Sequence, residues 1–110
     1  MRILYREHAD DRRDEEDVTY EEVRQVLQDG LVLRRYPEDE PYESRLVLGW
    51  VEGPARSGTY DRGRPIHVVA ADTPSGITWI ITVYEPDPTL WEDAFRWKKT
   101  WTDTTNTWRS

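Results

Sequence analysis

The sequence predicts a single α+β domain: an antiparallel sheet of four to five strands with two N-terminal helices and a C-terminal helix. Two β-rich runs, residues 68–71 and 77–84, flank a Thr-Pro-Ser-Gly turn at residues 73–76, which is typical of a hairpin. A strong helix signal precedes them at residues 19–30. Because consecutive strands with short connections usually pair antiparallel, the expected order is β-α-α-β-β-β-α, or β-α-α-β-β-β-β-α with one more strand.

The chain begins with a predicted strand and a charged helix. Residues 2–6 (RILYR) alternate as a short strand. Residues 7–17 are highly charged and are expected to be helical, and at helical spacing His8 and Arg12 share one face. Apart from that face, this helix has little to bury.

The second helix has the clearest signals. Thr19 and Glu22 form the pattern of a capping box, and Val18 and Val23 are placed for a hydrophobic staple around it. Gly30 supplies the C-terminal stop. We therefore expect a helix between Thr19 and Gly30.

Four strands follow in close succession. Residues 31–36 and 45–52 are predicted strands, separated by an acidic, proline-broken loop. Residues 53–63 form a long polar connection, and loops of this length in compact domains are often functional. The hairpin of residues 64–87 comes next. Its strands are apolar enough to be central in the sheet, so we expect the hydrophobic core there.

The last helix is predicted from Pro88, which is well placed at a helix start. Apolar side chains between residues 90 and 101 recur at a spacing of three to four, and Lys98 and Lys99 suit the negative end of a helix dipole. Residues 102–110 are Thr-rich without a clear period and are expected to form a flexible tail. The domain is thus predicted to span residues 1–101.

Composition limits the class of protein. A chain of 110 residues makes one domain, and six Trp and six Tyr can close a small core. The absence of cysteine excludes disulfides and thiolate metal sites. No apolar run approaches the roughly 18 residues of a membrane span, and the N-terminus has no apolar signal region, so a soluble cytoplasmic protein is expected.

The net charge of −7 is unevenly distributed. Residues 1–43 hold 14 acidic and 7 basic side chains, whereas residues 44–110 hold 8 of each. An acidic chain repels phosphate at long range, which counts against broad nucleic-acid binding. Two alternatives remain: a local basic patch, or a basic partner that docks on the acidic half.

Four motifs stand out along the chain. They are HADDR at residues 8–12, VTYEEV at 18–23, GRPIHVV at 63–69 and ITVYEPD at 81–87, followed by Trp91. Together they resemble the bacterial domain-of-unknown-function family 4258, over about residues 3–99. The element order is also similar to that of RelE- and BrnT-type toxins, which implies a RelE-like fold.

The resemblance implies a metal-independent endoribonuclease, the toxin of a toxin–antitoxin pair, with RNA as substrate and a cognate antitoxin as partner. Cleavage of RNA without metal needs a base, an acid and a cation for the phosphorane charge. The implied residues are His8 and His67 as acid and base, Arg12 and Arg64 as charge stabilisers, and Tyr84 as an orienting hydroxyl.

The chain departs from the family pattern in three respects. Glu16 and Asp17 stand where the family usually has a basic residue and a glycine. The connection at residues 53–63 is longer than expected, and the chain is acidic whereas ribonuclease toxins tend to be basic. The candidates also have structural explanations: His67 as a hydrogen-bonded sheet residue, His8 as a helix-surface residue and Tyr84 as an aromatic cover of the sheet edge.

Basic side chains in the second half are candidates for substrate binding. They are Arg62, Arg64, Arg96, Lys98 and Lys99. The last three interleave with two tryptophans, a pattern suited to stacking on and neutralising single-stranded RNA. A solvated loop arginine, or the cationic end of an amphipathic helix, accounts for the same residues.

The sequence lacks the common signatures of cofactor chemistry. It has no glycine-rich phosphate loop, Ser-His-Asp order, paired-carboxylate pattern or metal-ligand spacing, so no cofactor and no metal are expected. The competing function is a non-catalytic protein-interaction module whose acidic N-terminal half docks a basic partner.

Overall fold

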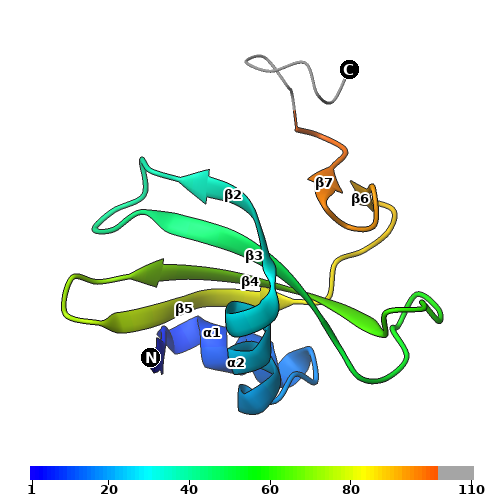
Figure 1. Cartoon of the computed structure of the whole chain (residues 1–110), viewed down its shortest axis with the longest axis horizontal. Coiled ribbons are helices and arrows are strands. Elements are labelled where there is room, and N and C mark those ends of the chain that lie inside the picture. The colour runs from blue at the N-terminus through cyan, green and yellow to red at the C-terminus, as the bar shows by residue number, and fades with distance from the viewer. Residues whose placement is uncertain (102–110) are drawn as a thin grey trace.

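A five-stranded mixed sheet is the centre of the protein, as seen in a computed structural model that describes residues 1–101 (Figure 1). The strand order across the sheet is β1-β5-β4-β3-β2, and β6 and β7 form a separate two-stranded hairpin. The elements are β1 (Arg2–Tyr5), α1 (Glu7–Glu15), α2 (Tyr20–Asp29), β2 (Leu31–Tyr36), β3 (Ser44–Val51), β4 (Arg64–Asp72), β5 (Ile77–Tyr84), β6 (Trp91–Glu92) and β7 (Trp97–Lys98).

The predicted strands are confirmed, with one correction to their pairing. Strands β2 to β5 pair antiparallel in sequence, including the β4–β5 hairpin. The prediction of a wholly antiparallel sheet is wrong for β1, which pairs parallel with β5. The rule that consecutive strands pair antiparallel does not apply to β1. Two helices separate β1 from β2, and the connection crosses from one edge of the sheet to the other.

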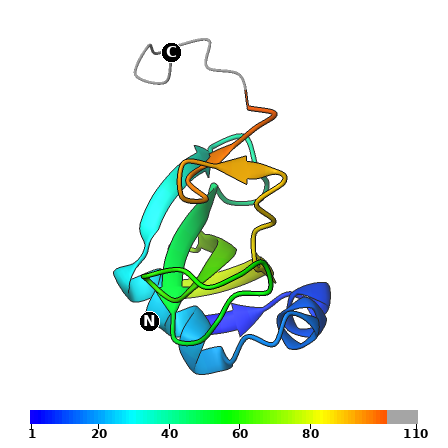
Figure 2. The same cartoon turned by 90° about the vertical axis from the view of Figure 1, so that its right-hand side faces the viewer.

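Both helices cover the same face of the sheet. Helix α1 packs on β5 and β1, and α2 packs on β3 and β4 (Figures 1 and 2). The predicted charged helix ends earlier than expected, at Glu15, since Asp17 adopts a left-handed backbone with φ of 58°.

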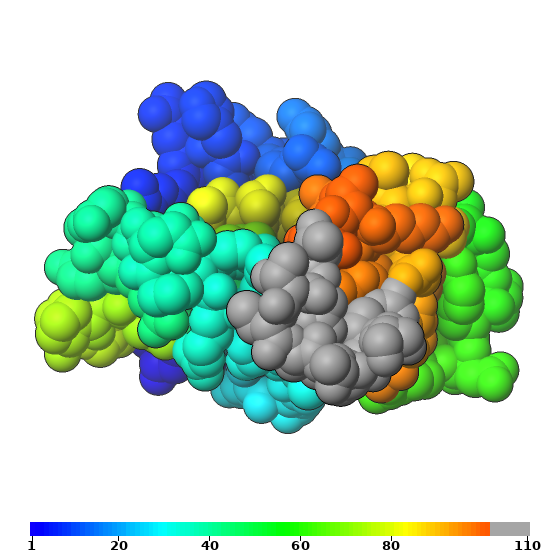
Figure 3. All heavy atoms as spheres, turned by 90° about the horizontal axis from the view of Figure 1, so that it is seen from above, coloured from blue at the N-terminus to red at the C-terminus, as the bar shows by residue number. Residues whose placement is uncertain are grey.

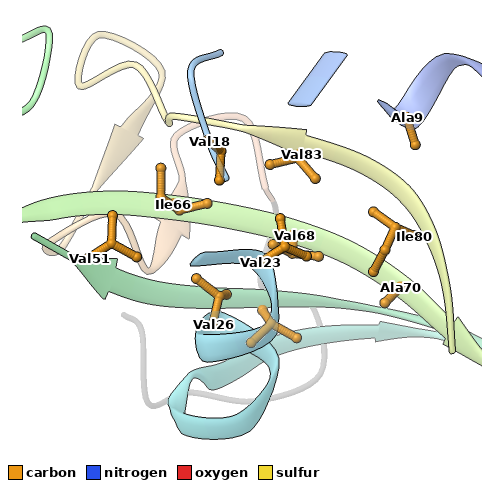
Figure 4. Close-up of a cluster of buried hydrophobic side chains, with 11 residues drawn as sticks. Ala9, Val18, Val23, Val26, Val51, Ile66, Val68, Ala70, Ile80 and Val83 are labelled. Carbon is orange, nitrogen blue, oxygen red and sulfur yellow. The ribbon is translucent and has the colours of Figure 1, made fainter. Parts of the chain in front are cut away.

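Alternate residues of β4 form the middle of the core under the helices. Ile66, Val68 and Ala70 have no exposed surface and lie in one cluster with Val23 and Val26 of α2 (Figure 4). The hairpin that the sequence places at the centre of the sheet therefore does supply the core.

Helix α2 lies so close to β3 that two glycines are required. Its capping box forms as predicted, with reciprocal hydrogen bonds between Thr19 and Glu22. A Cβ on Gly49 would lie 2.7 Å from Cγ2 of Val26. Gly30 does end the helix region, but with an extended backbone; a Cβ there would lie 2.7 Å from the Leu48 carbonyl oxygen.

The predicted C-terminal helix is wrong, because residues 91–98 form the β6–β7 hairpin. One helical turn does start at Asp87, whose carboxylate accepts from the Thr89 amide and whose carbonyl accepts from Trp91. The chain then reverses, so that Trp91 and Phe95 both reach the face of the sheet opposite the helices. The spacing of three to four that suggested a helix instead reflects packing on the sheet.

None of the helices in residues 1–101 is long and apolar enough to cross a bilayer. The flexible tail predicted for residues 102–110 lies outside the residues that the structure describes.

Replacing Gly49 by alanine should lower the free energy of unfolding by about 1–3 kcal/mol, since the new methyl group overlaps Val26. Urea denaturation measures the loss. A Val26→Ala background should retain much of this loss, because Cα and Cβ of Val26 also lie 2.9 Å from the position of the new methyl group. A Gly49→Ala variant as stable as the wild type would contradict the close approach of α2 to β3.

Candidate functional site

Two of the candidate residues, His67 and Tyr84, lie on the face of the sheet opposite the helices. Trp91 and Phe95 of the hairpin region are buried there against Leu46 and Leu48 of β3. His67 pairs in register with Leu48 on one side and with Tyr84 on the other. Part of β5 remains visible in Figure 3 between α1 and the turn after β2, so the hairpin covers only one portion of this face.

His67 is enclosed beneath the hairpin. Its side chain has 0% exposure, its Nε2 lies 2.9 Å from the Phe95 carbonyl oxygen, and its Nδ1 lies 3.2 Å from the Tyr84 hydroxyl. A carbonyl can only accept, so Nε2 carries the hydrogen and Nδ1 accepts from Tyr84. Burial lowers the pKa of His67 to about 4, against the opposing effect of the Phe95 carbonyl. The ring is therefore neutral at physiological pH and fully hydrogen-bonded.

Tyr84 connects this buried histidine to the outer part of the site. The Cζ atom of Arg12 lies 6.0 Å from the centroid of the Tyr84 ring, within reach of a cation–π interaction. Burial raises the pKa of Tyr84 to about 12, with a further rise from Tyr36 and an opposing effect of Arg12. The phenol keeps its proton at neutral pH, and its hydroxyl is oriented by His67.

His8 is exposed on α1 and borders a separate hollow. This hollow of about 290 Å³ is lined by His8, Asp11, Arg12, Glu15, Ile81 and Thr82. Arg12 thus lies next to His8 on one side and Tyr84 on the other. His67 does not line the hollow, so the structure does not bring the two histidines of the predicted acid–base pair to one solvent-accessible site.

Arg64, predicted as a phosphate contact, is buried and hydrogen-bonded within the fold. Its Nε donates to Glu85 at 2.7 Å, and its two terminal nitrogens donate to the carbonyls of Glu16 and Asp17. The Glu16 carboxylate in turn accepts from the Glu85 amide and from Arg56. This network attaches the end of α1 to β4 and β5, and all three nitrogens of the Arg64 guanidinium donate within it.

The other predicted basic residues are spread over two regions. Arg62 lies 5.5 Å from the Trp50 ring and, with Arg96, lines a hollow of about 520 Å³ near the end of α2. Arg96 forms an ion pair with Asp93. Lys98 lies within β7 and Lys99 follows it. None of these four lines the hollow beside His8 and Arg12.

Sequence reasoning missed two further arginines on this face. Arg6 lies 5.9 Å from the Trp79 ring, and Arg34 lies 4.8 Å from the Trp101 ring. With Arg12 over Tyr84, three arginines are each placed over an aromatic ring. Ion pairs among residues 1–101 involve only Arg13, Arg45, Arg56, Arg64 and Arg96. No local signal could have found these pairs, because their partners are 67 to 73 residues apart or come from different elements.

The family of the chain follows from a comparison with family models. Residues 5–85 match the model described as a domain of unknown function, DUF4258. The chain belongs to the DUF4258 family. The DUF4258 match includes both helices, strands β2 to β5 and every residue of the cluster Arg12, Tyr84, His67 and His8; of β1 it includes only Tyr5.

The DUF4258 match ends before the hairpin. The β6–β7 hairpin and the Phe95 carbonyl that binds His67 lie beyond residue 85. A comparison with the curated proteins and one with solved structures each found no match. Within residues 1–101, no three His, Asp or Glu side chains are grouped so that they could hold a metal ion.

Substituting Arg64 with methionine should lower the free energy of unfolding by about 3–5 kcal/mol, because it leaves the Glu85 carboxylate buried without its cation. Urea denaturation measures the change. The matched control is Arg62→Met, which removes only a contact with Trp50 and should cost less than about 1 kcal/mol. Similar losses in the two variants would refute the structural role of Arg64.

Acid should destabilise the protein through His67. The unfolded chain binds a proton at His67 below its ordinary pKa of 6.5, whereas the folded protein does so only below about 4. Falling pH therefore favours the unfolded state across this window, by about 3 kcal/mol in total.

Urea denaturation at several pH values tests this dependence. A His67→Gln variant should lose the slope between pH 6.5 and 4, and a His8→Gln control should keep it. NMR titration of the wild-type imidazole should place its midpoint near 4. A midpoint near 6.5 would contradict the burial of His67.

Proposed function

We propose that this protein is a metal-independent endoribonuclease of the RelE-like type and the toxin of a toxin–antitoxin pair. The observation that supports it most is the position of Arg12, which lines one hollow with the exposed His8 and lies 6.0 Å from the ring of Tyr84, whose hydroxyl binds His67. The resemblance of the sequence motifs to RelE- and BrnT-type toxins supports the same class. A cognate antitoxin is the expected protein partner.

The chemistry assigned to this cluster is transphosphorylation of RNA. His8 removes the proton of a ribose 2′-hydroxyl, and the resulting oxygen attacks the adjacent phosphorus. The bond from phosphorus to the 5′ oxygen breaks, and that oxygen takes up a proton from water in the open hollow. Arg12 stabilises the charge of the phosphorane, and the Tyr84 ring, 6.0 Å from its Cζ atom, orients the guanidinium. The products are a 2′,3′-cyclic phosphate and a free 5′-hydroxyl.

The arginines on the sheet face oppose the effect of the net charge. A net charge of −7 repels RNA at long range, but ionic strength screens that repulsion beyond about 8–10 Å. Arg6, Arg12 and Arg34 have no ion pairs within residues 1–101 and stand over aromatic rings on one face. Arginine beside aromatic rings is the composition that binds single-stranded nucleic acid.

The distribution of acidic residues supports a second candidate, a non-catalytic module that docks a basic partner. Exposed carboxylates are concentrated on the two helices. They include Glu7, Asp11, Asp14, Glu15, Glu21 and Asp29. Such a surface attracts basic partners, and the attraction weakens with added salt. A docking module of this kind requires no chemical reaction at Arg12.

Replacing Arg12 by alanine should lower RNA cleavage about 100-fold, because the phosphorane loses the cation that lines the hollow beside His8. His8→Ala should lower it at least as far. Cleavage of a labelled single-stranded RNA in the presence of a chelator measures the rate, and growth arrest on expression reports activity in cells.

The matched control is Arg35→Ala. Arg35 is exposed and lies in register with Arg45 and Ala70, on the helix side of the sheet, so cleavage should be unchanged. The ribonuclease proposal fails if the wild type neither cleaves RNA nor arrests growth, or if the His8→Ala variant is fully active. Salt-sensitive binding of a basic peptide by an inactive wild type would then favour the docking module.

A further inference from the structure

The β6–β7 hairpin is not a strand pair of the main sheet. Among residues 1–101 its strands pair with each other, Trp91 with Lys98 and Glu92 with Trp97. The hairpin lies beyond the residues that match the family model, which end at 85. Figures 1 and 2 show it on the opposite side of the sheet from the helices. The hairpin therefore lies outside the part of the chain that the family shares and packs on one face of the five-stranded sheet.

The turn of the hairpin is strained. Asp93, Ala94 and Phe95 adopt left-handed backbones in succession, with φ of 54°, 54° and 68°. Left-handed backbone disfavours every residue with a Cβ, and three such residues in a row are uncommon. None of the three is glycine, so the closed turn is held against its own backbone preference by the contacts that it makes.

Those contacts centre on His67. The strained Phe95 provides the carbonyl that accepts from Nε2 of His67. The Trp91 ring packs edge-on against the imidazole, with centroids 4.3 Å apart. Phe95 itself packs against Trp50 and Tyr60, at centroid distances of 6.0 and 5.3 Å. The hairpin therefore covers His67 on the face of the sheet opposite the helices, where a ligand beside Tyr84 would lie.

We propose that the β6–β7 hairpin is an autoinhibitory cover, which must leave the sheet face before His67 can reach a ligand beside Tyr84 and Arg12. This inference rests on the proposed ribonuclease function, because that function defines what opening of the hairpin would activate. In the closed form, the exposed cluster has a base, a cation and a hydroxyl, but His67 is sealed. Opening releases His67 from Phe95 and adds the second histidine, as the acid for the leaving 5′ oxygen.

Opposite substitutions at Ala94 test the cover in the full-length chain. Ala94 is exposed and contacts neither His67 nor Tyr84 in the closed form. Proline cannot adopt its φ of 54°, so Ala94→Pro should open the hairpin and raise RNA cleavage at least about tenfold. Glycine adopts this φ freely, so Ala94→Gly should close it further and lower cleavage about fivefold. Leu90→Ala, at an exposed position outside the strained turn, is the control. It should change neither the opening of the hairpin nor the rate of RNA cleavage.

Two measurements follow opening independently of RNA. NMR titration should move the midpoint of His67 in Ala94→Pro from about 4 toward 6.5, while the chemical shifts of β4 and β5 persist. In the wild type, native-state hydrogen exchange should show the hairpin amides of Arg96 and Lys99, which donate within residues 90–99, opening before those of β4.

The outcomes separate the two proposals. If no variant cleaves RNA but His67 becomes exposed in Ala94→Pro and the hairpin amides exchange early, the ribonuclease proposal fails and the displaceable hairpin stands. If the hairpin amides exchange only with global unfolding, or Ala94→Pro unfolds the whole domain, the hairpin is an integral part of the core and the cover is refuted. Cleavage that falls in Ala94→Pro although the sheet persists would also refute it.

Discussion

The alternation of side chains along β4 is the constraint on which both faces of the protein depend. Ile66, Val68 and Ala70 point to the helices and form the fully buried core, while His67 between them points to the opposite face. A shift of one residue in the register of β4 would exchange the two sets and place an imidazole under α2. The same pairing that builds the core therefore fixes where the histidine lies.

A buried ionic network determines how α1 meets the sheet. Arg64 at the start of β4 binds Glu85 after β5 and the two backbone carbonyls that follow α1. The carboxylate of Glu16, one of the two residues that provide these carbonyls, accepts from Arg56. Removing one partner of such a pair leaves a charge buried alone, which is far more costly than losing an exposed pair. The network positions Arg12, one turn earlier on α1, over the Tyr84 ring.

The proposed site has an exposed part and a sealed part. His8 and Arg12 border an open hollow on one side of Tyr84, and His67 lies on the other side beneath residues 91–95. The exposed part lies within the residues that match the DUF4258 model, and the seal lies beyond them. Variants at Arg12 and Ala94 therefore test cleavage and the opening of the hairpin separately.

The sequence by itself determined the local elements of this protein, and the tertiary structure decided which side chains meet. The capping box of Thr19 and Glu22 and the strands β2 and β5 depend on residues close in the chain, so their bounds were predictable. The burial of Arg64 and His67 and the hairpin of residues 91–98 depend on partners 17 to 48 residues away. Local spacing could not distinguish a helix from a hairpin that buries the same aromatic side chains, nor a free arginine from a buried one.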